Sequence, residues 1–250
     1  MATEWEVSAG TYHPEHRRKF ADAQADKWNV FRRDGFQNVG RLTPESVKEI
    51  REQLDKAPVT EVVAGVAHHY DIDAVLAIAQ FKTIAFLPEV TRIAAIHIGA
   101  EPKILDVSCW KTLPGDGGRE AAQRWHRDID DWRACKLFVY LTDVGPENGP
   151  HLFVPASHRY DFFEARGVPA DAYFLNGGSN PDLAETIESL PRFEVQAPAG
   201  HMFLVNTYGF HRGKPVTAGE RILFQVCYGL MEVEKFTGGT KIPKIRAKWG

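Results

Sequence analysis

The sequence has few cysteines, and they are not arranged to pair. Cys109, Cys135 and Cys227 lie far apart without a CxxC spacing, and an odd number of cysteines cannot pair completely within one chain. We therefore expect reduced thiols in an intracellular compartment rather than a disulfide framework.

Long apolar segments are also missing. No stretch of about 18 apolar residues suits a membrane span. The N-terminal residues MATEWEVSAG lack both the basic start and the apolar core of a signal peptide. We expect a cytoplasmic protein with no membrane insertion.

The chain has little net charge. Its 30 Lys and Arg residues nearly balance 33 Asp and Glu residues, and the resulting charge of -3 gives no reason to expect nucleic acid as a partner. The 250 residues are 44% hydrophobic and 25% charged, as in ordinary globular proteins. A single domain, 1–250, acting on a small molecule fits this composition, and no signal indicates an oligomeric state.

The first third of the chain has helical patterns. Apolar residues at helical spacing predict helices over three stretches, 14–32, 44–57 and 72–97, of which the third is expected to form one or two helices. Thr43 is expected to cap the second helix, with Pro44 at its first position, and Pro88 to interrupt the third. Residues 1–102 therefore read as a mainly helical support region.

From residue 103 onward the pattern predicts strands. Short stretches rich in branched and aromatic residues are separated by Gly, Pro, Asn and Asp. They are ILDVSCWKTL, CKLFVYLTDV, HLFVPAS, HMFLVNTY and RILFQVCYGL. Helices followed by strands favour an antiparallel two-sheet barrel or jelly roll, and residues 159–191 are expected to form a long recognition loop.

The stretch RWHRDIDDW, residues 124–132, offers metal ligands. Residues two apart on an extended chain point the same way, so His126 and Asp128 can bind one ion. His211, after the strand HMFLVN, is the candidate third ligand. Two histidines and one carboxylate leave coordination positions open, as in non-haem Fe(II) oxygenases, whereas zinc favours a tetrahedron. An isolated HxD also occurs by chance, so its context decides.

Two further features supply context. Arg221 opens the strand RILFQVCYG, and its planar fork suits a carboxylate, although an arginine at a strand start is more often solvated. A dicarboxylate that chelates iron at one end needs such a clamp at the other. Asp130 and Asp131 lack the spacing of a ligand and are expected to accept hydrogen bonds behind the site or to be solvated.

These motifs together resemble a known family. HRD at 126–128, NGPHLFVPASHR at 148–159, and His211 with Arg221 are similar to the Fe(II)- and 2-oxoglutarate-dependent dioxygenases of the phytanoyl-CoA dioxygenase type, which include ectoine hydroxylase. The resemblance covers about 103–230. It implies a mainly β protein with N-terminal helices, whose core 103–230 is a double-stranded β-helix, a distorted cupin-like jelly roll, followed by a tail, 231–250.

The resemblance also implies roles for residues. His126, Asp128 and His211 would bind Fe(II), and Arg221 would pair with the distal carboxylate of 2-oxoglutarate. Lys136 falls where similar sequences place a polar cosubstrate contact; an edge lysine that discourages strand pairing is the alternative.

Three other residues are candidate substrate contacts. Trp132 follows Asp128 by four positions, as does a pocket-lining aromatic in similar sequences. Lys111 is either a partner for an acidic substrate group or a solvated strand lysine. His151 follows NGP where an apolar residue is more usual, and is either a substrate contact or a surface variant. A small polar substrate is expected, anionic if the lysines contact it.

The implied reaction consumes O2 and 2-oxoglutarate, hydroxylates an unactivated C–H bond and releases succinate and CO2. Related halogenases replace the acidic ligand with a small residue, so Asp128 favours hydroxylation, or desaturation or cyclisation. A cupin-type metal-dependent isomerase or dioxygenase would not need Arg221. A non-catalytic ligand-binding domain would have no chemical need for all four residues.

Overall fold

The computed structural model describes residues 6–7, 30–63, 66–115, 123–128, 130–131, 133–167 and 186–230. Of the helix expected over 14–32, only residues 30–34 are described, and they are helical. The tail 231–250 and residues 168–185 of the expected loop lie outside these ranges. None of the helices within them is long and apolar enough to cross a bilayer.

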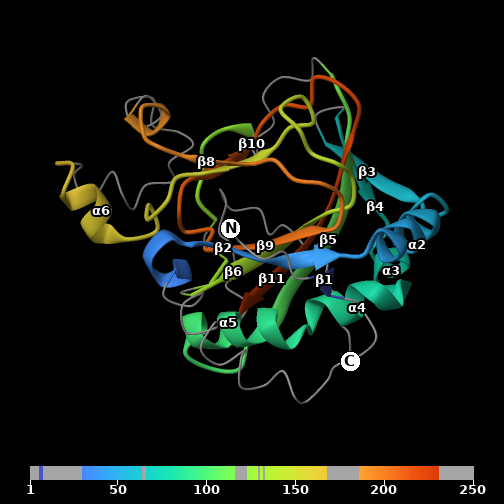
Figure 1. The fold of residues 1–250 in the computed structure, drawn as a ribbon, viewed down its shortest axis with the longest axis horizontal. Helices are drawn as coiled ribbons and strands as arrows, with labels where there is room; N and C mark the ends of the chain where they lie inside the picture. The colour runs from blue at the N-terminus through green and yellow to red at the C-terminus, as the bar shows by residue number, and fades with distance from the viewer. Residues whose placement is uncertain are drawn as a thin grey trace, which may run out of the picture.

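Two β-sheets face each other (Figure 1). The large sheet has the strand order β1-β2-β9-β6-β11-β5-β4-β3. Its strands are β1 (Glu6–Val7), β2 (Phe36–Leu42), β3 (Val59–Val63), β4 (Ala67–Tyr70), β5 (Lys103–Thr112), β6 (Cys135–Tyr140), β9 (His201–Val205) and β11 (Arg221–Gly229). The small sheet has the order β10-β7-β8, with β7 (His151–Phe153), β8 (Phe193–Val195) and β10 (His211–Gly213).

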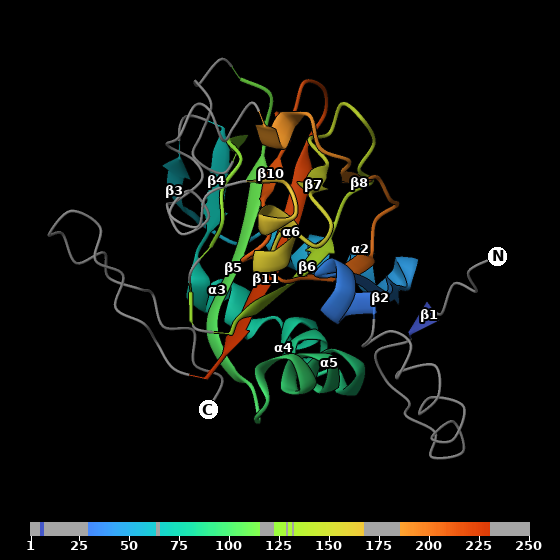
Figure 2. The ribbon, with the colours of Figure 1, turned by 90° about the vertical axis from the view of Figure 1, so that its left-hand side faces the viewer.

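The topology is that of a jelly roll. β11 lies between β5 and β6 and pairs antiparallel with both, although β5 and β6 precede it by many residues (Figure 2). Apart from the parallel pair β1 and β2, the paired strands in the described part of the chain are antiparallel. The double-stranded β-helix expected from the resemblance is confirmed.

Alternation along the strands separates two apolar cores. On β11, Ile222 and Phe224 belong to the core between the large sheet and the helices, whereas Leu223 belongs to the core between the two sheets. On β6, Leu137 and Phe138 divide in the same way. Every second residue of a strand points to the same face, so polar residues in phase with Leu223 or Phe138 face the barrel interior.

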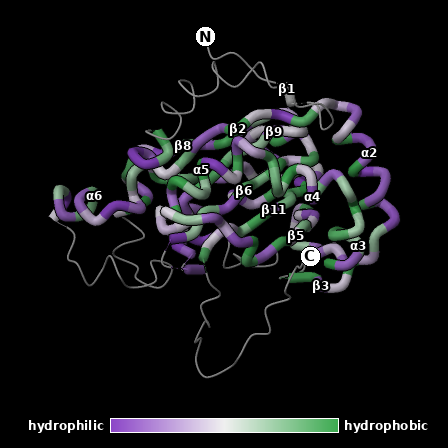
Figure 3. Tube along the Cα trace, turned by 90° about the horizontal axis from the view of Figure 1, so that it is seen from below, coloured by the Kyte–Doolittle hydropathy of each residue, from purple (hydrophilic) through white to green (hydrophobic). Residues whose placement is uncertain are grey.

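Helices cover the outer face of the large sheet. They are α2 (Pro44–Leu54), α3 (Ile72–Ala77), α4 (Ala79–Ala85) and α5 (Pro88–Ile98), while the short α6 (Tyr160–Glu164) lies on the loop side. α4 and α5 lie beneath the large sheet in Figure 1, and α2 and α6, at the periphery, are largely hydrophilic in Figure 3. This layer buries the outward-facing strand residues.

Local sequence explains the helix ends. The Thr43 hydroxyl accepts a hydrogen bond from the Ser46 N–H at 3.2 Å, which confirms the expected cap of α2. The helical stretch is interrupted before Pro88, as expected: α4 ends at Ala85 and Pro88 begins α5, because the first turn needs no donor from that position. Gly99, with φ of 85°, ends α5 in the left-handed conformation that glycine adopts without strain.

The region before residue 103 also supplies strands, which the mainly helical expectation missed. β2 pairs with β9, and β4 pairs with β5. A bulge between Asn38 and Gly40 breaks the alternation of β2, and β3 is largely exposed, so neither strand shows a clear period of two. The strand β2 occupies the segment FQNVGRL, Phe36–Leu42.

We predict that Phe224→Ala destabilises the protein by about 3–5 kcal/mol, the usual cost of emptying a buried phenylalanine site. Phe224 of β11 stacks on Phe81 of α4, with ring centroids 3.9 Å apart and planes 10° apart. This contact joins the sheet to its helix layer. Denaturant unfolding measures the change. Ile96→Ala on the exposed side of α5 is the matched control, expected to lose less than about 1 kcal/mol. Equal losses would contradict the prediction.

Candidate active site

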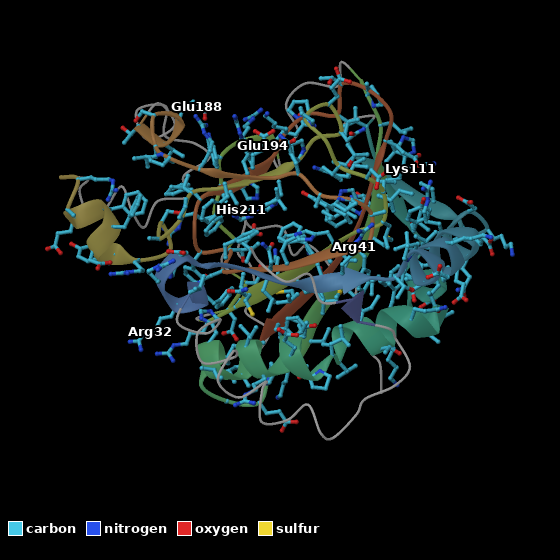
Figure 4. All side chains as sticks on the ribbon, in the orientation of Figure 1. Arg32, Arg41, Lys111, Glu188, Glu194 and His211 are labelled. Atoms are coloured by element: carbon cyan, nitrogen blue, oxygen red, sulfur yellow. The ribbon has the colours of Figure 1, made fainter. Side chains whose placement is uncertain are left out.

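The interior-facing polar residues gather around one cavity of about 270 Å³ between the two sheets. Figure 4 shows His211 near the middle of the barrel, between the sheets. Residues lining the cavity are His69, Ser108, Trp110, Gln123, His126, Asp128, Phe138, Tyr140, His151, His211, Gly213, Arg221, Leu223 and Gln225. The cavity therefore contains the candidate metal ligands and Arg221 together.

A backbone bridge places the two candidate metal-binding histidines side by side. The His126 N–H donates to the His211 carbonyl at 3.1 Å, and the His211 N–H donates to the His126 carbonyl at 3.0 Å. The Asp128 N–H donates to the Thr207 carbonyl at 2.8 Å, which continues the pairing. The HxD segment thus lies along the edge of the small sheet, beside β10.

The three side chains converge as a metal site requires. One ligand atom from each of His126, Asp128 and His211 lies within 4.8 Å of the others. His126 Nδ1 lies 2.8 Å from the Arg124 carbonyl and His211 Nδ1 lies 2.9 Å from the Gly209 carbonyl. Since carbonyls only accept, each Nδ1 carries the proton and each Nε2 keeps a lone pair for an ion. The donor set fits a divalent iron with open positions.

Burial and neighbouring charges set the protonation states of His126 and Asp128. Burial, followed by the neighbouring His211, lowers the pKa of His126 to about 4, so its imidazole is neutral at pH 7. Burial alone would raise the pKa of Asp128, but Lys136 and His211 outweigh it and hold that pKa well below its usual value. Both groups are therefore in the protonation state that binds a cation.

Lys136 lies behind the candidate metal ligands. Its Nζ is 2.6 Å from Asp128 Oδ2 and 2.9 Å from Asp130 Oδ2, and the side chain is 9% exposed. Burial lowers its pKa, but the two carboxylates raise it well above the usual value. It is not among the residues that line the cavity, and β6 lies between β9 and β11, which excludes the edge lysine.

The two other acids of the HxD segment also have structural partners. Asp130 pairs with Lys136. Asp131 Oδ2 accepts the backbone N–H of Leu230, just after β11, and the Asp131 carbonyl accepts the Tyr208 hydroxyl at 2.6 Å. Both are buried acceptors behind the site, so the solvated alternative is excluded.

Arg221 faces the same cavity as the metal ligands. Its guanidinium donates to the Gly149 carbonyl and, at 3.4 Å, to the Thr112 hydroxyl. A Cβ built on Gly213 would lie 3.2 Å from Arg221 Nη1, so the glycine leaves room for the guanidinium against β10. The side chain is buried and held by β5, the NGP loop and β10, which excludes a solvated arginine.

His151 lies inside the barrel rather than on the surface. Its ring stacks on His211 with centroids 5.6 Å apart and planes 23° apart, and it contacts Phe138 at 5.0 Å. Its backbone N–H donates to the Tyr140 hydroxyl at 3.0 Å, and that hydroxyl donates to the Val195 carbonyl at 3.1 Å. Tyr140 thus links the large sheet to β7 and β8.

The expectation for Lys111 is corrected. It pairs in register with Ile222, a residue of the helix-side core, whereas its neighbour Trp110 lines the cavity. Alternation along β5 therefore turns Lys111 away from the cavity. Figure 4 places Lys111 apart from His211. Trp132 lies outside the described residues.

The sequence reasoning missed one wall of the cavity. It is formed by His69 of β4, Ser108 and Trp110 of β5, and Gln225 of β11. His69 and Trp110 stack with centroids 5.5 Å apart and planes 22° apart. The alternation of β5 held a signal for Ser108 and Trp110, but the strand pattern alone does not tell which face is the interior.

A second cluster fixes the start of the HxD segment. The Trp125 indole N–H donates to Glu188, which also accepts from Arg212 at 2.9 Å. The Arg212 guanidinium lies 4.7 Å from the Trp125 ring. Arg127 turns the other way and donates to the Tyr208 carbonyl. Trp125 is therefore structural.

Within the jelly-roll folds, two histidines and an aspartate that leave coordination positions open, with an arginine facing them, define the class of Fe(II)- and 2-oxoglutarate-dependent dioxygenases. The chain belongs to one family of that class. It is a member of the phytanoyl-CoA dioxygenase (PhyH) family, whose sequence pattern matches residues 31–222.

Curated relatives are ectoine dioxygenases. That of Bordetella parapertussis is 28% identical over 181 residues, covering 62% of this chain and 56% of the relative. That of Nocardia farcinica is 26% identical over 174 residues, covering 62% and 57%. The chain thus spans just over half the length of the curated relatives it matches.

Solved structures share the fold at low identity. The non-haem α-ketoglutarate-dependent epimerase SnoN from nogalamycin biosynthesis has a TM-score of 0.63 at 18% identity, covering 92% of this chain and 96% of the other. HygX from Streptomyces hygroscopicus, solved with nickel, 2-oxoglutarate and hygromycin B, has a TM-score of 0.58 at 18% identity, covering 82% and 86%. EctD from S. alaskensis with bound Fe has a TM-score of 0.57 at 19% identity, covering 90% and 86%.

We predict that Lys136→Met destabilises the metal-free protein by about 3–5 kcal/mol, because it leaves two buried carboxylates without their cation. Lys111→Met is the matched control on the other face of the sheet, expected to cost less than about 1 kcal/mol. Denaturant unfolding in the presence of a chelator measures both. Similar losses in the two variants would contradict the pairing of Lys136 with Asp128 and Asp130.

We predict that the loss of stability caused by Lys136→Met depends on pH. The folded pKa of Asp128 lies below its unfolded value of about 3.9, so its stabilisation is present above that pH and is lost as pH falls through the folded pKa. The folded pKa of Lys136 is raised, so the stabilisation that Lys136 contributes is fully present below its unfolded pKa of about 10.4 and is lost as pH rises through the folded pKa. The cost of Lys136→Met should therefore be largest between about pH 4 and 10 and shrink in stronger acid.

Proposed function

We propose that this protein is a non-haem Fe(II)- and 2-oxoglutarate-dependent dioxygenase that hydroxylates an unactivated C–H bond of a small polar substrate. The observation that carries the proposal is that Arg221 and the set His126, Asp128 and His211 line one cavity. A metal protein that does not use a dicarboxylate has no need for the buried guanidinium. O2 and the substrate would enter the same cavity.

In this proposal His126, Asp128 and His211 hold the iron through two Nε2 atoms and a carboxylate oxygen. The Nδ1 hydrogen bonds to backbone carbonyls fix both imidazole rings, so the ligands need little reorganisation to bind. Lys136 holds the other side of the Asp128 carboxylate. An aspartate at this position leaves no room for a halide, which supports hydroxylation over halogenation.

Arg221 would pair with the distal carboxylate of 2-oxoglutarate. Its guanidinium is buried and anchored by Thr112 and Gly149, so it presents its charge in a fixed direction. When bound, iron and 2-oxoglutarate together reduce O2, releasing succinate and CO2 and placing one oxygen atom on the substrate. The protein's share is to orient the substrate C–H bond and to exclude water.

The cavity supports a neutral polar substrate. Among the described lining residues, Arg221 is the one side chain with a permanent positive charge, and the cosubstrate would occupy it. Lys111 faces away and Lys136 is neutralised by two carboxylates. The far wall offers hydroxyl and amide groups, from Ser108 and Gln225, beside aromatic rings. An anionic substrate would find no cation there.

The proposal also covers the whole protein. We propose that the chain is a single catalytic domain and that Trp132 contacts the substrate. A cytoplasmic location is supported by three free, buried thiols at Cys109, Cys135 and Cys227.

We predict that anaerobic addition of Fe(II) and 2-oxoglutarate to the metal-free protein produces the weak visible charge-transfer band of an iron chelate. Arg221→Ala should raise the Kd of 2-oxoglutarate roughly 10- to 100-fold, the effect of losing a charged hydrogen-bonded pair. Iron binding should be unchanged. Arg51→Ala, which removes a half-exposed arginine paired with Glu220, is the matched control and should leave both affinities unchanged.

Two outcomes would contradict this function. Stoichiometric iron binding without a band on adding 2-oxoglutarate would favour a cupin-type reaction that does not use the cosubstrate. A band of full intensity in Arg221→Ala would remove the assigned role of Arg221. If the band appears, release of succinate on exposure to O2 becomes the assay for screening neutral hydroxylated or amide-bearing substrates.

A further inference from the structure

His151 has a buried polar atom with no partner. Its Nε2 makes no hydrogen bond within the described part of the chain, and the residue is 6% exposed. Buried polar atoms are nearly always hydrogen-bonded, and leaving one unpaired costs free energy. Such an atom lining a ligand cavity is a candidate ligand contact.

The ring cannot easily turn to find another partner. The centroid of the His151 ring lies 5.0 Å from that of Phe138 and 5.5 Å from that of Phe203, and the ring stacks on His211. Its backbone is paired on both sides, with Gly213 of β10 and Val195 of β8. The imidazole is therefore held in place before any ligand arrives.

The position of His151 lies between the two ends of the site. On one side its ring meets His211, a candidate iron ligand. On the other side is Gly213, its direct partner across the strands, where an added Cβ would lie 3.2 Å from Arg221 Nη1. His151, His211 and Arg221 line one cavity, so a molecule that bridges the iron ligands and Arg221 lies within reach of this histidine.

We propose that His151 is a cosubstrate-binding residue whose Nε2 forms a hydrogen bond to an oxygen atom of 2-oxoglutarate. This inference rests on the proposed function and adds a third protein contact to the metal centre and Arg221. As a neutral imidazole with its proton on Nε2, His151 donates this bond.

The identity of the residue supports a specific role. The surrounding side chains Phe138 and Phe203 belong to an apolar cluster that would accommodate an apolar residue. A leucine would pack there without leaving a polar atom unpaired. The histidine therefore has a chemical use that packing alone does not explain.

The test measures cosubstrate binding without turnover. Fe(II)-loaded protein is titrated anaerobically with 2-oxoglutarate, in the absence of substrate, and the charge-transfer band gives the Kd and the band energy. His151→Leu should raise the Kd about tenfold and shift the band, while the Kd for Fe(II) stays the same. His151→Gln, which keeps a donor, should recover part of the affinity. His201→Leu removes a histidine outside the cavity and should change nothing.

A direct measurement on the unaltered protein covers the case in which His151→Leu folds poorly. In the Zn(II)-loaded protein, nitrogen NMR of labelled histidines should show the Nε2 resonance of His151 shifting on addition of 2-oxoglutarate. The resonance is assigned by its absence in His151→Gln.

The outcomes separate the two proposals. A wild-type band with an unchanged Kd in folded His151→Leu, or an Nε2 resonance that does not move, would overturn the role of His151 and leave the proposed function intact. Absence of the band in the wild-type protein would overturn the proposed function and this inference with it. An Nε2 resonance that moves only on addition of a turnover substrate would make His151 a substrate contact instead.

Discussion

The site depends on one pair of backbone hydrogen bonds, those that join His126 to His211. These residues are 211 - 126 = 85 positions apart, and the two N–H to carbonyl bonds hold them directly opposite each other at the edge of the small sheet. Side chains of such a pair point to the same face, which here is the barrel interior. Asp128, two residues on, then joins them through the extended geometry of the HxD segment.

The large sheet is the rigid support for this pair. Its outer face is buried against α4 and α5, and its inner face carries Lys136, Arg221 and the wall around Trp110. Tyr140 ties that inner face to the small sheet through its hydroxyl. Arg221 stands on β11, which pairs with β5 and β6, and His211 stands on β10, which pairs with β7 and bridges to His126. Because these side chains are carried by paired backbone, the distance from Arg221 to the metal ligands is set by the fold.

Much of this could be read from the sequence, and the failures have definite causes. The strands from residue 103 onward and the cap at Thr43 follow local patterns, and the structure has them. The interruption of the helical stretch at Pro88 was also correct, whereas the strand β2 was hidden by its bulge. Lys111 was assigned by its charge, but the alternation of β5 turns its side chain away from the cavity. Lys136 was assigned by its position in similar sequences, but its ammonium is held by two buried carboxylates, a pairing that sequence position alone does not reveal.

The charges of the site support the proposed neutral substrate. With ligand histidines neutral on a metal, the two positive charges of Fe(II) and one of Arg221 would balance the two negative charges of 2-oxoglutarate and one of Asp128. The positive charge of Lys136 and the negative charge of Asp130 balance each other behind these groups. A buried charge without a partner is costly, so the loaded cavity has no counter-charge left for an ionic substrate. In the proposed function, aromatic and amide contacts on the wall of His69, Trp110 and Gln225 would then select the neutral molecule that binds.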